Sequence, residues 1–198
     1  MSDRRKTLVM DKSVFVALLR GINVGGKNKL PMAELAGLFE EAGCQDVRTY
    51  IQSGNVVYRA GTHLVKAVPR SVAAAIEQRY GYSVPVVTRS AAELSAIVAE
   101  NPFLLRTGDE AVDPKSLHVA FLQDKPTASR VRELDPDRSP PDEFVLSGRE
   151  VFLHCPNGLA RTKLTNAWLD SKLKTVSTVR NWKTVGVLAE WSADPQSS

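Results

Sequence analysis

The sequence contains few cysteines and no long apolar segment. Only two cysteines, Cys44 and Cys155, occur in 198 residues, and each is flanked by unrelated sequence. A secreted chain of this size usually carries an even, regularly spaced set, so we interpret both as free thiols in a reducing compartment. The longest apolar runs, such as Val14–Leu19, are far shorter than the roughly 20 residues that cross a bilayer.

The N-terminal residues also lack the features of an export signal. Met1–Lys12 is polar and basic and contains no apolar core, which is not typical of a secretory signal. We therefore expect a cytoplasmic protein with no membrane partner. We also expect Met1–Lys12 and Asp194–Ser198 to form tails outside the folded part.

Residue types that build common catalytic and metal sites are sparse. The three histidines, His63, His118 and His154, are scattered, and no G-x-S-x-G element of a hydrolase occurs. His118 and His154 fall on strands that we expect to be neighbours, but the sequence suggests no third metal ligand beside them. We therefore predict neither a metal site nor a cofactor, and the sequence leaves open whether the protein is an enzyme.

The positive charge of the chain is concentrated in its first half. The formal net charge is +4. Residues 1–100 contain 13 lysines and arginines against 9 acidic residues, whereas residues 101–198 contain 13 of each. The excess therefore lies in the half that also holds a glycine-rich segment, which favours an anionic partner there.

Two parts of the chain show the same order of predicted elements. The first contains a strand at Val14–Arg20, a helix from Pro31 to Gly43, a hairpin at Asp46–Tyr58, a helix through Val68 to Tyr80, a strand at Val84–Thr88 and a helix at Ser90–Glu100. The second contains a strand at Leu117–Leu122, a helix at Thr127–Leu134, a hairpin of Glu143–Leu146 and Glu150–His154, a helix at Ala160–Leu173, a strand at Val176–Val179 and a helix at Asn181–Ala189. In the first hairpin, Val47, Thr49 and Ile51 alternate with Arg48, Tyr50 and Gln52 as in a strand, and Ser53-Gly54-Asn55 supplies the turn. Gly81 predicts a helix end, Ser90 with Glu93 predicts a capping box, and Asn181 can cap the last helix. Each part has the βαββαβ order of the ferredoxin-like fold, followed by one more helix.

We therefore predict an α+β protein of two ferredoxin-like βαββαβ halves with duplicated topology, packed together. The expected boundaries are 13–100 for the N-terminal half, 101–114 for a linker without periodicity and 115–191 for the C-terminal half. Val14–Leu19 is apolar at every position, so both faces of this strand should be buried. Because helices cover only one sheet face in a ferredoxin-like half, we expect the other half to cover the second face.

A basic glycine-rich loop follows the first strand. Gly21–Asn28 comes close to the phosphate-binding pattern G-x-x-x-x-G-K-[ST], but Asn28 stands where a hydroxyl would coordinate magnesium, and Pro31 places the helix start too late. This disfavours a nucleoside triphosphatase. Two interpretations stay open: an anion site formed by backbone N–H groups with Lys27 and Lys29, or a tight turn whose lysines are solvated.

Other candidate ligand-binding residues lie near the ends of predicted elements. Arg161 and Lys163 fall at the start of a predicted helix, where the helix dipole favours a nearby anion, and Arg180 and Lys183 flank the start of the last helix. The polar side chains of the hairpin turn either contact a ligand or satisfy the turn itself. The full candidate set is Arg20, Asn23, Gly25, Gly26, Lys27, Lys29, Gln52, Asn55, Arg161, Lys163, Arg180 and Lys183.

Four motifs together resemble one known family. In chain order they are LLRGINVGGKNKLPMAEL, RTYIQSGNVVY, ARTKLTN and TVRNWKTV. With them the chain, from about Val14 to Glu190, resembles the bacterial proteins grouped as domain of unknown function 1697 (DUF1697). The resemblance implies a two-part α+β structure of ferredoxin-like halves, and it implies no established activity, substrate or catalytic residue.

Three functions are consistent with these observations. The leading hypothesis is a protein that binds a phosphate-bearing ligand, a nucleotide or a nucleic-acid segment, in a basic cleft. An alternative is an enzyme acting on a phosphorylated or acyl-phosphate small molecule, with Arg20 or Lys27 on the phosphate and Asn23 or Asn55 positioning a water. A third is a structural or protein-interaction module, in which Arg20 and Arg180 form buried salt bridges with acidic residues such as Asp46 or Asp170.

Overall fold

The two halves contain the same succession of strands and helices. The structure, a computed structural model, describes residues 12–193, so the predicted tails lie outside the described residues except for Lys12. The N-terminal half consists of β1 (Lys12–Leu19), α1 (Met32–Glu41), β2 (Gln45–Tyr50), β3 (Asn55–Gly61), the 3-10 turn η1 (Thr62–Leu64), α2 (Val68–Tyr80), β4 (Val86–Ser90) and α3 (Ala91–Ala99). After the 3-10 turns η2 (Gly108–Glu110) and η3 (Pro114–Ser116), the C-terminal half consists of β5 (Leu117–Leu122), α4 (Ala128–Val131), β6 (Glu143–Ser147), β7 (Glu150–His154), α5 (Asn166–Leu173), β8 (Ser177–Asn181) and α6 (Trp182–Ala193).

Each half forms one four-stranded antiparallel sheet. The strand orders are β2-β3-β1-β4 and β6-β7-β5-β8, so the first strand of each half lies between its third and fourth strands. This is the strand order that a βαββαβ unit gives in the ferredoxin-like fold. The predicted fold class is therefore confirmed. The boundaries 13–100, 101–114 and 115–191 stay predictions.

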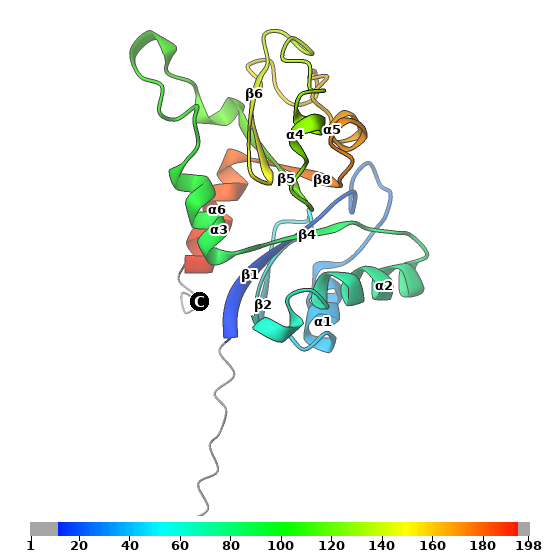
Figure 1. Cartoon of the computed structure of the whole chain (residues 1–198). Coiled ribbons are helices and arrows are strands. Elements are labelled where there is room, and N and C mark those ends of the chain that lie inside the picture. The colour runs from blue at the N-terminus through cyan, green and yellow to red at the C-terminus, as the bar shows by residue number, and fades with distance from the viewer. Residues whose placement is uncertain (1–11, 194–198) are drawn as a thin grey trace, which may run out of the picture.

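The two sheets face each other across a shared core (Figure 1). Helices α1 and α2 cover the outer face of the first sheet, where they pack on Phe15, Ala17 and Leu19 of β1. The inner face, with Val16 and Leu18, packs on α3, α6 and the second sheet, as the apolar run of β1 predicts. Helix α5 covers the outer face of the second sheet. The halves are thus joined through a continuous apolar layer.

Local signals fix several element ends as predicted. Ser90 accepts a hydrogen bond from the backbone N–H of Glu93, and the Glu93 carboxylate accepts one from the N–H of Ser90, which completes the predicted capping box of α3. Gly81 ends α2 with φ +76°, a left-handed conformation that glycine adopts without steric cost. Asn181 accepts the N–H of Thr184 at 2.8 Å and begins α6, also as predicted.

Two predicted elements differ in the structure. Helix α5 begins at Asn166 rather than Ala160, because Thr165 accepts the N–H of Trp168 and the preceding segment is held as a loop by Ser139, which accepts the N–H of Lys163. Ile51 is not a strand residue: β2 ends at Tyr50, and Ile51 adopts φ +48° in the turn before β3. The first difference places Arg161 and Lys163 in a loop rather than in a helix, and the second places Gln52 in the turn.

One further result concerns membranes and thiols. Within residues 12–193, no helix combines the length and the apolar character needed to cross a bilayer. Cys44 and Cys155 are both buried and free, in agreement with the predicted unpaired thiols.

Candidate functional site

Two arginines occupy equivalent positions in the two halves. Arg89 of β4 pairs with Val16 of β1, and Arg180 of β8 pairs with Val119 of β5. In each half the next residue is the N-cap of the following helix, α3 or α6. Because strand order and register are the same, each residue near Arg89 can be compared with the residue at the equivalent position near Arg180.

Each arginine reaches across to the opposite half. Arg89 donates to the carbonyl oxygens of Leu122 at 2.8 Å and Arg149 at 3.0 Å. Arg180 donates to the carbonyl oxygens of Leu19 at 2.6 Å and Ser53 at 3.1 Å. Leu19 and Leu122 end β1 and β5, so the two sets of contacts are reciprocal. Reciprocal contacts of this kind define an approximate two-fold relation between the halves.

The two arginines differ in whether a carboxylate neutralises their charge. The Arg89 side chain is fully buried and pairs at 2.7 Å with Glu150, the first residue of β7. The equivalent first residue of β3 is the neutral Asn55, whose amide oxygen accepts from Arg180. Among the described residues, no carboxylate forms an ion pair with Arg180. Burial lowers the pKa of Arg180 to about 10, because its cation is removed from water without a counter-charge.

A cavity lies beside each arginine, between the halves. The Arg89 cavity has a volume of about 670 Å³ and is lined by Phe15, Val65, Lys66, Pro69, Arg70, Ala73, Val84, Pro85, Val86, Thr88, Arg89, Ser90, Glu93, Gln123, Asp124 and Arg149. The Arg180 cavity has a volume of about 340 Å³ and is lined by Leu19, Arg20, Gly21, Ile22, Val24, Ile51, Ser53, His118, Leu159, Asn166, Thr178, Val179, Arg180, Asn181 and Thr184. Both volumes fall within the range of small-molecule sites.

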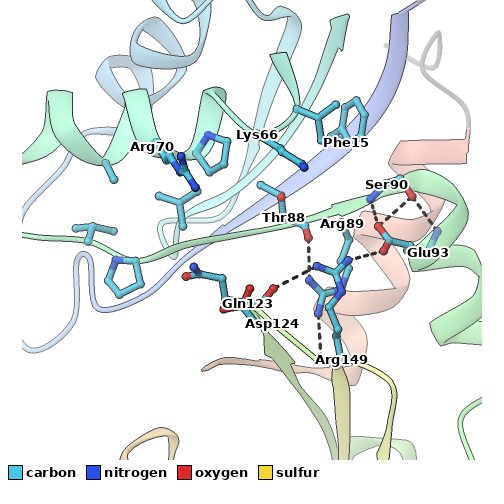
Figure 2. A pocket seen from close by; sticks show the side chains of 16 residues that line it. Phe15, Lys66, Arg70, Thr88, Arg89, Ser90, Glu93, Gln123, Asp124 and Arg149 are labelled. Atoms are coloured by element: carbon cyan, nitrogen blue, oxygen red, sulfur yellow. Dashed lines mark hydrogen bonds and ion pairs between the residues drawn. The ribbon is translucent and has the colours of Figure 1, made fainter. Parts of the chain in front are cut away.

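Carboxylates already occupy the Arg89 cavity (Figure 2). Glu93 accepts from the backbone N–H of Ser90 at 2.8 Å and forms an ion pair with Arg149. The Glu93 carboxylate thus caps the N-terminal turn of α3 and pairs Arg149, whereas Arg89 is paired by Glu150. Lys66 and Arg70 lie on the opposite, α2 side of the same cavity.

The Arg180 cavity lacks the equivalent carboxylate. Thr184 stands at the third position of α6, where Glu93 stands in α3, and the first turn of α6 contains no acidic residue. The N-terminal N–H groups of a helix and its dipole attract negative charge. An unneutralised guanidinium and an acid-free helix start therefore converge on one cavity.

His118 lies in the same cavity and is the equivalent of Phe15. It faces Asn181 across the β5–β8 pair, as Phe15 faces Ser90 across the β1–β4 pair. Its Nδ1 lies 3.2 Å from the carbonyl oxygen of Ser116, and no hydrogen bond involves its other ring nitrogen within residues 12–193. Burial lowers the pKa of His118, so the imidazole is neutral near pH 7.

Only two of the predicted binding side chains line the Arg180 cavity. They are Arg180 itself and Arg20, which pairs with Asp170 at 2.6 Å and donates to the carbonyl of Ser177 at 2.9 Å. The Arg20–Asp170 pair joins the partners expected for a structural role, but it is half-buried rather than buried. Asp46, the other acid named there, pairs instead with Arg59.

The glycine-rich loop folds into a small hairpin of its own. Val24 and Lys27 form an antiparallel bridge around Gly25 and Gly26, whose φ angles are +58° and +74°. The Asn23 amide donates to the carbonyl oxygens of Leu30 and Gln52, so its polar atoms serve the loop. Gly21 and Val24 border the Arg180 cavity, whereas Lys27 and Lys29 are exposed and do not line it.

The remaining candidates are spread more widely. Asn55 is buried and donates to the carbonyl of Tyr50 at 3.1 Å. Arg161 and Lys163 lie in the loop before α5, outside a helical first turn, and neither lines the cavity. Lys183 lies in the first turn of α6, exposed and outside the cavity lining.

The sequence interpretation missed His118 and Thr184 as cavity residues. The available signal was the repeated pattern of a strand-end arginine followed by a helix N-cap, Arg89-Ser90 and Arg180-Asn181. The two neighbouring-strand histidines do not meet: His118 lines the cavity, whereas His154 contacts Glu143 at 3.2 Å. In the part of the chain that the structure describes, no group of three or more potential metal ligands is found.

The sheets define a protein of two ferredoxin-like halves, with a cavity beside the strand-end arginine of each half. Residues 12–152 match the model of a family described as protein of unknown function (DUF1697), and the chain belongs to this family. A structure of similar fold is "conserved bacterial protein SP0830" from Streptococcus pneumoniae. It is 19% identical, with a TM-score of 0.69 over 93% of this chain and 100% of that one. No curated protein matches the chain.

Proposed function

We propose that this protein binds a phosphate-bearing small molecule in the Arg180 cavity. The observation that carries the proposal is the internal comparison of the two arginines. Beside Arg89, Glu93 supplies a carboxylate at the helix start, and Glu150 of the opposite half neutralises the arginine. Beside Arg180, Thr184 stands at the helix start and Asn55 of the opposite half stands in place of the glutamate, and a ligand anion takes the place of the absent carboxylates.

The dimensions of the cavity favour a small ligand. A volume of about 340 Å³ suits a mononucleotide or a smaller organic phosphate rather than a segment of nucleic acid. The polar groups available to the ligand are the Thr184 hydroxyl, the second ring nitrogen of His118 and the amide nitrogen of Asn166. Arg180 contributes mainly its charge, because its N–H groups already donate to the opposite half.

The enzymatic alternative has less support from side-chain contacts. Asn23 and Asn55, the residues expected to position a water, are engaged within the fold. His118 is the one titratable group of the described cavity lining that is neutral near pH 7. Binding is therefore the function that we propose, and hydrolysis of a bound phosphate is a separate question for the same assays.

Thr184→Glu tests the proposal by copying Glu93 into the C-terminal half. Wild-type protein should bind inorganic phosphate and adenosine monophosphate in calorimetric titrations at low salt. Thr184→Glu should lower both affinities at least about tenfold, because a carboxylate then faces the ligand anion. Thr184→Gln keeps the size without the charge and should retain most of the binding.

Lys27→Ala serves as the charge-matched control outside the cavity. It removes a cation from the exposed glycine-rich hairpin and should change the affinity less than Thr184→Glu does. Binding that depends on Lys27 and ignores Thr184→Glu would move the site to the loop. A wild-type protein that binds neither anion at low salt would contradict the proposal and favour the structural alternative.

A further inference from the structure

Exposed apolar side chains gather at the mouth of the Arg180 cavity. The described residues include six exposed large hydrophobic side chains, of which three line this one cavity. They are Val24, Ile51 and Leu159, with exposed fractions of 66%, 52% and 39%. They come from three separate segments: the glycine-rich hairpin, the β2–β3 turn and the loop before α5. Scattered single apolar residues are normal on surfaces, but convergence of this kind marks a contact site.

Ile51 is also held in an unfavourable backbone conformation. Its φ of +48° lies in the left-handed region, which β-branched residues avoid because the side chain collides with the backbone. Glycine or asparagine adopts this conformation readily. The equivalent β6–β7 turn uses glycine, Gly148, where φ is positive.

Packing does not account for the isoleucine. Ile51 belongs to none of the three apolar core clusters, and half of its side chain faces solvent. Neither the backbone nor the core therefore favours isoleucine over asparagine at this position. Strained residues of this type concentrate at ligand-binding positions.

We propose that the ligand of the Arg180 cavity is an organic phosphate whose apolar or aromatic group packs on Val24, Ile51 and Leu159. This inference rests on the proposed function and adds the chemical class of the organic part. The floor of the cavity, with Arg180 and Thr184, holds the anionic group, and the apolar mouth holds the remainder. The glycine-rich hairpin then contributes Val24 rather than its lysines.

Three phosphate anions separate the contributions of the two parts of the ligand. Inorganic phosphate reports on the floor alone, glycerol phosphate adds a polar group, and phenyl phosphate adds an apolar one. Wild-type protein should bind phenyl phosphate about tenfold more tightly than glycerol phosphate, as burial of part of a phenyl group predicts. Equal affinities would overturn the apolar contact.

Ile51→Asn is the variant that tests the residue. It should remove most of the preference for phenyl phosphate, leave the affinity for inorganic phosphate unchanged, and raise the thermal midpoint because asparagine tolerates the left-handed conformation. Leu105→Asn is the control: Leu105 is 73% exposed and lies outside the cavity. This variant should change both affinities and the thermal midpoint little.

The outcomes distinguish this inference from the proposed function. If wild type binds inorganic phosphate in a Thr184-dependent way but does not prefer phenyl phosphate, only the apolar contact fails. If it binds neither anion, both fail. If Ile51→Asn instead changes the sedimentation of the protein from a dimer to a monomer, a second copy covers Ile51 and the inference is overturned.

Discussion

The Arg89 cavity and the Arg180 cavity contain equivalent strand-end arginines, one fully buried and one half-buried, whose charges are neutralised to different extents. Both arginines leave their own sheet at the same register position and donate to carbonyl oxygens at the end of a strand in the other half. Arg89 meets Glu150, whereas Arg180 meets Asn55. Both arginines therefore join the halves through hydrogen bonds, but only Arg180 keeps a charge that no carboxylate neutralises and that a ligand can use.

Replacing each arginine by methionine should give the largest effects and test that separation. Arg89→Met leaves Glu150, with 15% side-chain exposure, without its counter-charge, and should cost about 3–5 kcal/mol of unfolding free energy. Arg180→Met leaves unpaired carbonyl oxygens but removes an unneutralised charge, and should cost about 1–3 kcal/mol. Urea denaturation of both variants measures the difference, and equal losses would mean that Glu150 and Asn55 are energetically equivalent.

Alanine at the two hairpin glycines compares the turns that receive these arginines. At Gly54, with φ +70°, an added Cβ would lie 2.7 Å from the Leu19 Cβ, so we expect a loss of about 3 kcal/mol or more from backbone strain plus overpacking. At Gly148, with φ +61°, the nearest atom is 3.6 Å away, and the backbone alone should cost about 1–2 kcal/mol. Thermal or urea unfolding checks the order. A larger loss at Gly148 would contradict the close approach of Leu19.

His118→Phe should produce the smallest effect, and it copies Phe15 into the second cavity. Burial lowers the pKa of His118 below its ordinary 6.5, so the folded protein binds this proton less readily than the unfolded chain. The contribution to stability is complete above pH 6.5 and is lost as the pH falls through the lowered pKa. His118→Phe should therefore flatten the loss of stability between pH 7.5 and acid, measured by urea unfolding. His63→Gln, at an exposed position outside both cavities, should leave that slope unchanged.

Short-range patterns in the sequence were enough to predict the sheets and most helices. The apolar run Val14–Leu19 required a strand buried on both faces, and Ser90 with Glu93 formed the expected capping box. The start of α5 was mispredicted because Ala160 and its neighbours are compatible with a helix, while the contact that holds them in a loop comes from Ser139. Tertiary contacts of this kind leave no local pattern.

The candidate site was less accessible from the sequence for the same reason. Arg180 was identified from its place beside a helix start, but its acceptors lie in the N-terminal half and include backbone carbonyls, which any residue type supplies. The alternation of Val47, Thr49 and Ile51 with polar residues predicts that Ile51 belongs to a strand. Its left-handed conformation depends on the turn that brings Gly54 against Leu19.

The reciprocal contacts, in which each half's arginine binds carbonyl oxygens of the other half, have a consequence for the ancestry of the chain. A single half has no carbonyl groups of a partner to receive its strand-end arginine, whereas two copies related by a two-fold axis satisfy both arginines at once. In such a homodimer every substitution appears twice, so the two cavities are identical. Joining the copies into one polypeptide removes that restriction, and Glu150 in one half and Asn55 in the other are a divergence that a fused pair can hold and a homodimer cannot.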